Sequence, residues 1–255
     1  MKLCFDGEKD RMPKKSGKTG AESSSLVQDA PLTRVSRRRL QTRKRLLKAA
    51  YEVMSTQGVD GATIQEVTER ADIGFGTFYS YFKSKDELAA QVLDCLINDL
   101  GRRNDLATRA WKGSDPARVQ AFAARLTVRE ALSQPMWQWW AKRPDLLADR
   151  MQESFKPFGV RDIILATRAG VYRVDENDAE SVWSQMVWMM VGGLRDVIVG
   201  KQPPTHERLI AELLMRVLGV STEVAHEITT APLPEYPPAD IDFSYDVTLD
   251  PAMQV

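Results

Sequence analysis

The sequence predicts an all-α protein in which a small helix-turn-helix unit precedes a larger helical domain. The chain has 255 residues, enough for one large domain or two modest ones with a substantial buried core. Apolar residues recur at helical spacing through most of the chain, and glycine or proline stands where many of these runs begin or stop. The strict alternation of apolar and polar residues that indicates a strand occurs from Ile241 to Leu249.

The helix-turn-helix is predicted within residues 63–85, TIQEVTERADIGFGTFYSYFKSK. Thr63 is followed three residues later by Glu66, the pattern of a capping box at a helix start. Helical spacing continues through Ile64, Val67 and Ala71, and the run from Asp72 to Gly74 breaks it, with Gly74 free to take a backbone angle that most residues avoid. A second short helix follows, and Phe78 and Phe82 are expected to pack it against the first helix of the domain. Two short helices joined by a three-residue turn are the outline of a helix-turn-helix.

Further helices are expected on both sides of this unit. The first runs from about residue 36 to 57 and stops at Gly58. Another begins after Ser84, which forms a second capping box with Glu87, and extends to about Leu100. The remaining predicted helical segments cover residues 115–134, 136–143, 145–155, 160–169, 178–199 and 205–218.

Charge is distributed unevenly although 35 basic and 35 acidic residues give a formal net charge of zero. Eight basic residues and no acidic one lie between residues 33 and 48, whereas seven acidic residues and no Lys or Arg lie between 220 and 255. This asymmetry predicts a polyanionic partner. From Arg37, Arg38 and Arg39 we expect contacts to a DNA groove or to phosphates, and a solvated helix face is the alternative.

The start of the second short helix carries side chains suited to the major groove of DNA. Thr77 can donate or accept a hydrogen bond at a base edge, and Gly76 lets the backbone come close to DNA. Phe75 can lie against a thymine methyl group or pack inside the domain, and both interpretations stay open. Phosphate contacts are expected from Thr63, Tyr79, Tyr81 and Lys85.

Residues 40–100 resemble the N-terminal domain of the tetracycline-repressor (TetR) family of transcriptional regulators. The resemblance is carried by ATIQEVTERADIGFGTFYSYFKSKDEL and by the preceding TRKRLLKAAYEVMSTQGVDG, which corresponds to the family's first helix. The sequence departs from the family pattern at Gly74, where a side-chain phosphate contact is lost, and at Phe75, where a polar or basic reader is common. The resemblance implies DNA contacts from Thr63, Thr77, Tyr79, Tyr81 and Lys85.

The resemblance also implies a homodimer whose last two long helices form a four-helix interface. The segment 178–199 is apolar nearly all round, so it needs cover on both sides, and plain hydrophobic core is the alternative to a partner subunit. Gly192 and Gly193 would permit close helix approach. The expected interface residues are Val182, Met189, Gly193, Val197, Leu209, Leu213 and Val217.

A pocket for a small hydrophobic or aromatic effector is expected in the C-terminal helical domain. The chain has six tryptophans and ten methionines, side chains that line adaptable apolar pockets but more often form plain core. Ligand binding would change the spacing of the recognition helices, with the helix after Ser84 as the lever. The candidate pocket residues are Trp137, Trp140, Trp183, Met186, Trp188 and Met190.

Other classes of function find little support. Cys4 and Cys95 give no disulfide framework, and neither cysteines nor histidines have metal-ligand spacing, so no cofactor is expected. No nucleophile motif or phosphate loop indicates an enzyme. The longest apolar run, nine residues from Met186 to Leu194, is far below the ~20 residues that span a bilayer. We expect a cytoplasmic repressor with a double-stranded DNA operator, and an architectural DNA-binding protein without a ligand is the alternative.

These observations divide the chain into four regions. Residues 1–32 are expected to be a disordered polar extension, 33–85 the DNA-binding domain, 86–228 the ligand-binding and dimerisation domain, and 229–255 an acidic tail containing several prolines. For the tail we favour a disordered segment with scattered apolar residues. Docking of the tail on the body or on a second subunit is the alternative.

Overall fold

The computed structural model describes residues 34–246, and over this range the chain forms ten α-helices, three single-turn 3₁₀ helices and no strand. The prediction of an all-α fold is confirmed. The expected extension over residues 1–32 and the end of the tail, residues 247–255, lie outside the described range. Across 34–246 no helix is long and apolar enough to cross a membrane.

Four helices build the N-terminal part of the described chain. The helical path of the first is interrupted at Gly58, the predicted stop, which adopts a φ of 77°, and a short helical stretch beyond this kink continues to Gly61. The third is a single turn, shorter than predicted, since the chain turns away from it before Ser84 caps the next helix. The helices are α1 (Arg34–Gly61), α2 (Ile64–Arg70), α3 (Phe75–Phe78) and α4 (Lys85–Thr108).

Aromatic side chains hold the one-turn helix α3 in place. Phe78 and Phe82 are fully buried, and their rings lie 5.8 Å apart. They share a buried cluster with Leu47 of α1 and Val67 of α2. The predicted core packing of both phenylalanines is therefore confirmed, and α3 depends on it because short isolated helices are marginal in water.

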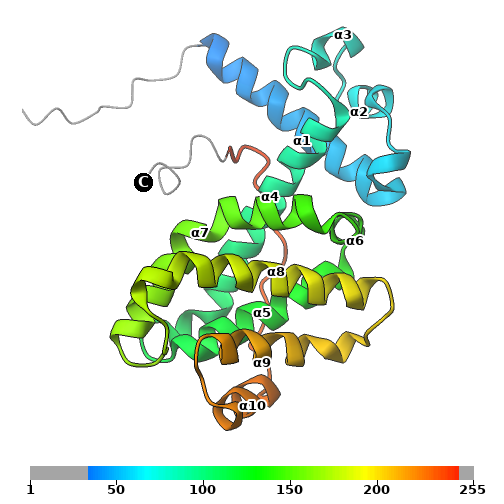
Figure 1. Cartoon of the computed structure of the whole chain (residues 1–255). Helices are drawn as coiled ribbons and strands as arrows, with labels where there is room; N and C mark the ends of the chain where they lie inside the picture. Colours follow the sequence, from blue (N-terminus) through cyan, green and yellow to red (C-terminus); the bar gives the residue numbers. More distant parts are fainter. Residues whose placement is uncertain (1–33, 247–255) are drawn as a thin grey trace, which may run out of the picture. The chain divides into compact units, whose positions relative to one another are not determined.

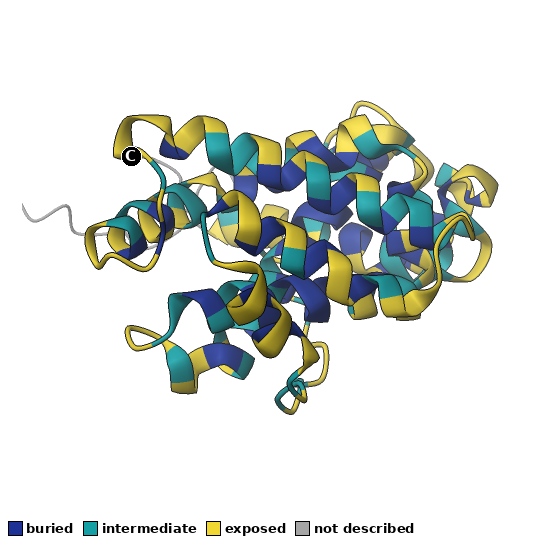
Figure 2. Ribbon diagram, turned by 60° about the horizontal axis from the view of Figure 1, so that its bottom comes forward, coloured by how far each residue is buried: buried dark blue, intermediate teal, exposed yellow. Residues whose placement is uncertain are grey.

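Six helices form the larger C-terminal part (Figure 1). Each turns its buried residues toward neighbouring helices and its exposed residues outward (Figure 2). Asp115 caps the first of them and Pro116 takes its first position, as predicted. The helices are α5 (Pro116–Ser133), α6 (Pro135–Ala141), α7 (Pro144–Arg168), α8 (Ala179–Ile198), α9 (Glu207–Val217) and α10 (Thr222–Thr230).

Two of these helices differ from the sequence prediction. The prediction of two segments at 145–155 and 160–169 is wrong: α7 runs through both and contains Pro157, which supplies no N–H to the helix. Packing along α8 maintains its helical path, with Trp183 pressed against Gly159. No helix is predicted at α10, whose start is capped by Ser221, the acceptor of the Val224 N–H at 3.3 Å.

The chain beyond α10 packs on the body, so the favoured prediction of a disordered tail is wrong for its described part. Figure 1 shows this segment, in salmon, leaving the α9 and α10 end of the domain and passing α5 and α4 toward α1. We call residues 232–246 the C-terminal strap. Phe243 is buried, with its ring 5.5 Å from that of Tyr51 in α1. Residues 241–246 form no strand, because their contacts are to helices and not to a second extended segment.

A buried carboxylate joins the α5 and α9 layers. Glu207, the first residue of α9, is 4% exposed, and its carboxylate lies 2.7 Å from Nε of Arg129 and 3.3 Å from the guanidinium of Arg125. Arg125 is 2% exposed and also donates to the carbonyl of Ala231 at 2.8 Å. A buried ion pair is tolerated because each charge faces its partner, so removal of one member leaves the other without compensation.

We predict that Glu207→Gln lowers the free energy of unfolding by about 3 kcal/mol, because the buried Arg125 then lacks its counter-charge. Urea denaturation followed by circular dichroism measures this loss. Glu176→Gln is the matched control, since Glu176 pairs with Arg168 at an exposed site and should have little effect. Equal losses in the two variants would contradict a special role for burial.

Candidate DNA-binding and effector sites

The connection between α2 and α3 is fixed by a helix cap and by one unusual backbone angle. The Thr63 hydroxyl accepts the N–H of Glu66 at 3.2 Å and the Thr63 backbone N–H donates to the Glu66 carboxylate at 2.9 Å, so the predicted capping box is present. The Thr63 hydroxyl also donates to this carboxylate at 2.7 Å. The prediction of an unusual angle at Gly74 is wrong, since its φ is −61°. Asp72 has the positive φ of 51° instead, and Arg45 donates to its carbonyl at 2.9 Å.

Helix α3 presents aromatic and polar groups to solvent. Phe75 and Tyr79 are 53% and 55% exposed, and their rings meet edge to face with centroids 6.0 Å apart. Gly76 and Thr77 lie between them and are exposed as well. A Cβ at Gly76 would meet no atom within 4 Å, so the backbone is open to a partner there. The exposure of Phe75 removes the alternative in which its ring packs inside the domain.

Other predicted DNA contacts already make contacts within the protein. The Lys85 ammonium donates to the carbonyls of Asp60 and Ala62 at 3.1 and 2.8 Å and so ties the start of α4 to the end of α1. An ammonium has three donors, which leaves one for a phosphate. Tyr81 is half-buried, with the guanidinium of Arg39 5.7 Å from its ring centroid. Arg37 and Arg38 are exposed near the start of α1.

A contact missed by sequence reasoning joins α6 to the end of α1. The Trp139 indole N–H donates to the Asp60 carboxylate at 2.9 Å, and Arg143 donates to the same carboxylate at 3.0 Å. The Arg143 guanidinium lies 3.5 Å from the Trp139 ring centroid. These hydrogen bonds, the one from Trp139 foremost, hold the pKa of Asp60 below its usual range. No spacing signal links these residues, because Asp60 and Trp139 are far apart in sequence.

A cavity of about 600 Å³ lies in the C-terminal part, with lining residues from α4, α5, α7 and α8. This volume is within the range of small-molecule sites. Gly159 allows the indole of Trp183 to form part of the wall, since a Cβ there would lie 2.4 Å from that ring. Three buried polar atoms on lining residues have no hydrogen-bond partner within the described chain: Asn104 Oδ1, Ser154 Oγ and Trp183 Nε1.

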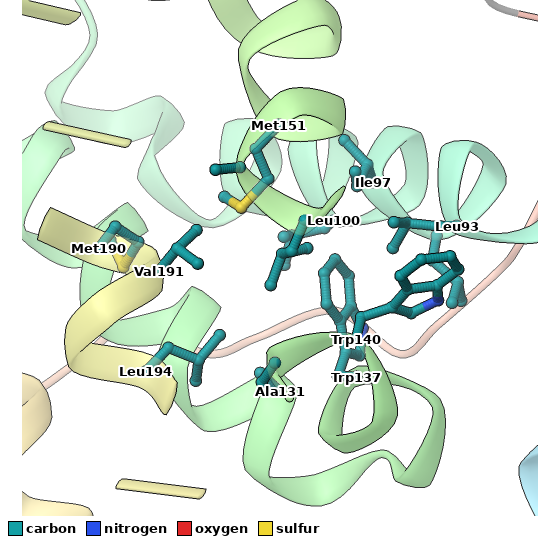
Figure 3. Packing of buried hydrophobic residues seen from close by; sticks show 14 of the residues in the cluster. Leu93, Ile97, Leu100, Ala131, Trp137, Trp140, Met151, Met190, Val191 and Leu194 are labelled. Atoms are coloured by element: carbon teal, nitrogen blue, oxygen red, sulfur yellow. The ribbon is translucent and has the colours of Figure 1, made fainter. Parts of the chain in front are cut away.

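Three of the six candidate pocket residues, Trp183, Met186 and Met190, line this cavity. Trp137 and Trp140 do not line it. Each is 2% exposed and lies in the buried cluster with Leu93, Ile97 and Leu100 of α4, as the close-up in Figure 3 shows. Trp188 is 42% exposed and faces away from the core. The assignment of Trp137, Trp140 and Trp188 to the pocket is therefore wrong for this cavity.

The outer surface of α8 and α9 carries an apolar face. A Cβ at Gly193 would lie 2.7 Å from Ile210 of α9, and Val197 is buried, so these two predicted interface residues pack within their own chain. Val182 and Met189 are half-buried. The exposed face contains Gly192, which is open to solvent, together with Trp188, Leu209, Leu213 and Val217.

Two family models match most of the helical chain. One, described as bacterial regulatory proteins of the tetR family, matches residues 46–92, and the other, a tetracyclin repressor-like C-terminal domain, matches residues 115–231. The chain belongs to the TetR family of transcriptional regulators. The resemblance drawn from the sequence is thereby confirmed. Transcriptional regulators are not enzymes, which agrees with the lack of a catalytic motif.

Curated TetR relatives align mainly with the DNA-binding part. The regulator YvdT of Bacillus subtilis is 39% identical over 54 residues, which are 21% of this chain and 28% of that protein. The repressor DhaR of Mycobacterium sp. is 33% identical over 25% of this chain and 32% of its own. The regulator TcmR of Streptomyces glaucescens is 27% identical over 61% of this chain and 72% of its own. The chain thus spans less than two thirds of YvdT and DhaR.

Solved structures of a TetR-like fold extend the similarity to the C-terminal part. The crystal structure of RolR in complex with resorcinol has a TM-score of 0.71 at 27% identity and covers 79% of this chain and 99% of that chain. RolR without ligand has a TM-score of 0.68 at 26% identity, over 76% of this chain and 99% of that chain.

A buried acid on α4 makes stability depend on pH. Asp94 is 4% exposed, and its carboxylate lies 3.3 Å from the Arg150 guanidinium of α7. Burial raises the pKa of Asp94 to about 6, in spite of the attraction of Arg150. A carboxyl group with a raised pKa stabilises the fold when protonated, and this contribution is lost as the pH rises through 6.

We therefore predict that Asp94→Asn is more stable than the wild type at pH 8 by an amount on the order of 2–3 kcal/mol, and that the difference shrinks toward pH 4. Urea denaturation at several pH values measures both curves. Asp149→Asn is the control, because Asp149 is exposed on α7, next to Arg150, the partner of Asp94. A pH-independent difference for Asp94→Asn would rule out a perturbed carboxyl.

Proposed function

We propose that this TetR-family regulator is a repressor that binds a pseudo-palindromic operator as a homodimer and is released by a small aromatic effector. It would act in the cytoplasm, on nucleoid DNA. The observation that carries the proposal is the course of α4, which begins at Lys85 against the connection between α1 and α2 and lines the 600 Å³ cavity from Ile97 onward. One helix therefore connects the DNA-binding part with the cavity.

In the proposed DNA complex, α3 enters the major groove with its exposed face toward the bases. Thr77 would form a hydrogen bond to a base edge, and the Phe75 ring would contact a thymine methyl group. Tyr79 supports the Phe75 ring by the edge-to-face contact at 6.0 Å, and its hydroxyl would contact a phosphate of the DNA backbone. Phosphate contacts would come from Arg37, Arg38, Arg39, Tyr81 and the remaining donor of Lys85. At Gly74 and Gly76 the protein backbone itself would come close to the DNA.

Thr63 has a weaker claim to a phosphate. Its hydroxyl already donates to Glu66, so only its oxygen lone pairs remain and these repel a phosphate oxygen. Its structural role as the cap of α2 accounts for its presence.

The proposed dimer face is the exposed apolar face of α8 and α9. Trp188, Leu209, Leu213 and Val217 are each 36–43% exposed, a concentration of large apolar side chains that is typical of a protein interface. Two copies joined through these helices would bring four helices together. A dimer also gives the two recognition helices a fixed separation, which for successive major grooves is about 34–36 Å.

The proposed effector is a small aromatic molecule that carries hydroxyl groups or similar polar substituents. Apolar and aromatic walls would bury its ring, while the unpartnered atoms of Asn104, Ser154 and Trp183 would meet its polar groups. Resorcinol in the similar protein RolR supports this size and chemistry. DhaR, a relative in the DNA-binding part, is named a repressor, which supports the proposed sign of regulation.

The DNA-binding part of the proposal is tested by selection of bound sequences from random DNA. We expect a pseudo-palindrome whose half-sites lie about one helical turn apart. Phe75→Ala should relax the preference at one thymine position in each half-site by roughly 1–3 kcal/mol, with an unchanged salt dependence. Arg37→Ala is the contrasting control, since loss of a phosphate contact should weaken binding to all sequences and lower the salt slope by about one. A single half-site would argue against the dimer, and the same consensus from Phe75→Ala would argue against readout by Phe75.

The effector part is tested by titration of phenolic compounds, resorcinol first, against tryptophan fluorescence and operator binding. We expect one compound class to quench fluorescence and to release DNA with the same concentration dependence. Gly159→Ala should weaken compound binding by about tenfold or more, because the added methyl group displaces the Trp183 ring from the cavity wall. Gly61→Ala is the control, since a Cβ there meets only Gln57 at an ordinary 3.6 Å. A DNA-binding protein that no compound releases would be an architectural protein without a ligand.

A further inference from the structure

The C-terminal strap begins where the second family model ends, at residue 231, and its described part runs to residue 246. Two arginines hold the first half of the strap on the body, and a third holds the residue before it. Arg125 of α5 donates to the carbonyl of Ala231 at 2.8 Å, just before the strap. Arg103 and Arg102 of α4 donate to the carbonyls of Pro237 and Asp240 at 3.4 and 3.0 Å. This half of the strap is therefore fixed to the helices of the C-terminal part.

The second half of the strap lies on α1 of the DNA-binding part. Phe243 packs against Tyr51 and is 8% exposed. Beyond it, Arg43 donates to the carbonyl of Tyr245 at 3.3 Å and pairs with the Asp246 carboxylate at 3.4 Å. The strap is thus a tether between the two parts of the chain, separate from α4.

Tyr245 gives this tether a connection to the effector cavity. Tyr245 is half-buried and belongs to the cavity wall, and its carbonyl accepts the hydrogen bond from Arg43. Tyr245 therefore contacts both the cavity that a ligand would fill and α1, the helix that carries Arg37, Arg38 and Arg39. A displacement of the Tyr245 backbone would change the Arg43 contact, because Arg43 donates to its carbonyl.

We propose that the C-terminal strap couples the effector cavity to the DNA-binding part, and that a bound effector moves Tyr245 and loosens the hold of the strap on α1. This inference rests on the proposed role of the cavity as an effector site. The strap is suited to a partial release, because Phe243 anchors it by burial, whereas Tyr245 and Asp246 are held at a partly exposed polar end. Such polar contacts are individually weak, so this end can move while the rest of the strap stays docked.

Cys95 provides a native reporter of strap release. Its side chain is fully buried on α4, its Sγ lies 4.0 Å from the carbonyl oxygen of Tyr245, and burial raises the pKa of the thiol to about 12. A thiol reagent reacts with the thiolate, so movement of the strap should expose and activate this group. In the full chain with Cys4→Ser, the rate of maleimide addition reports on Cys95 alone.

The test compares two strap variants with a matched control. We expect Phe243→Ala to raise the labelling rate of Cys95 by about tenfold or more, as for local opening of a docked segment. Asp246→Asn, which weakens a partly buried ion pair and leaves Phe243 in the core, should raise it by a smaller factor. Glu235→Gln is the control, because Glu235 is an exposed strap residue. Rates in both strap variants that equal the control would overturn the proposal.

The coupling itself is measured as the ratio of operator Kd values with and without resorcinol. We expect resorcinol to raise the labelling rate in the unaltered strap, and we expect the Kd ratio to fall to within about twofold of one in Phe243→Ala. If Phe243→Ala keeps the Kd ratio of the wild type although its Cys95 is labelled fast, the strap does not couple effector binding to DNA binding.

A failed effector is distinguishable from a failed strap. If neither resorcinol nor other phenols change tryptophan fluorescence, the proposed effector chemistry is wrong, and the selected operator then serves as the probe. If the strap couples to the DNA-binding part, operator binding must change the rate of Cys95 labelling in the protein with the wild-type strap, and it must not do so in Phe243→Ala. An operator that leaves labelling unchanged in both would overturn the role of the strap.

Discussion

Burial of α4 on nearly every side is the constraint on which the rest of the structure depends. Half of its 24 residues are buried, and these include the charged residues Asp94, Asp99 and Arg103. Charges in such positions must be paired, and Arg103 lies 2.7 Å from the Asp99 carboxylate and 2.5 Å from that of Glu130 in α5. Because separation of these pairs would leave uncompensated buried charge, α4 keeps its rotation and register relative to α5. A rigid α4 can carry a displacement from one end to the other.

The DNA-binding part is attached to this rigid helix by contacts of different strength. Lys85 ties the start of α4 to the end of α1, and the hydrogen bonds of Trp139 and Arg143 to Asp60 hold the same end against α6. The strap reaches α1 from the other side, near Arg43 and Tyr51. The end of α1 is thus held by short polar contacts to two helices. Its middle packs on the core through Leu46, Leu47 and Ala50, and the strap adds to this packing at Arg43, which also donates to Gln91 of α4 at 2.6 Å.

The sequence predicts correctly those helix ends that are fixed by residues close together in the chain. The capping box of Thr63 and the start of α5 at Pro116 follow from short-range hydrogen bonds and backbone geometry, and both are present. The face of α8 could not be assigned, because a helix that is apolar all round gives no preferred direction, so Trp188 was placed inward and Gly193 outward. Docking of the tail stays only the alternative prediction for another reason. Its partners Arg43, Arg102 and Arg103 lie well over a hundred residues away, and nothing in the tail's own composition identifies them.

The strap also bears on how a ligand can act at all. A ligand shifts an equilibrium only by the difference in its affinity for two states, so the cavity must change shape between them. The walls from α4 and α5 are held by buried ion pairs and resist such a change. The Tyr245 wall belongs to a segment whose last anchors are partly exposed, and it is therefore the part of the lining best able to differ between two states. In the proposed mechanism, the lining residue that adapts to a ligand is also the one whose carbonyl contacts Arg43 of α1, so the strap is a candidate for the switch in addition to α4.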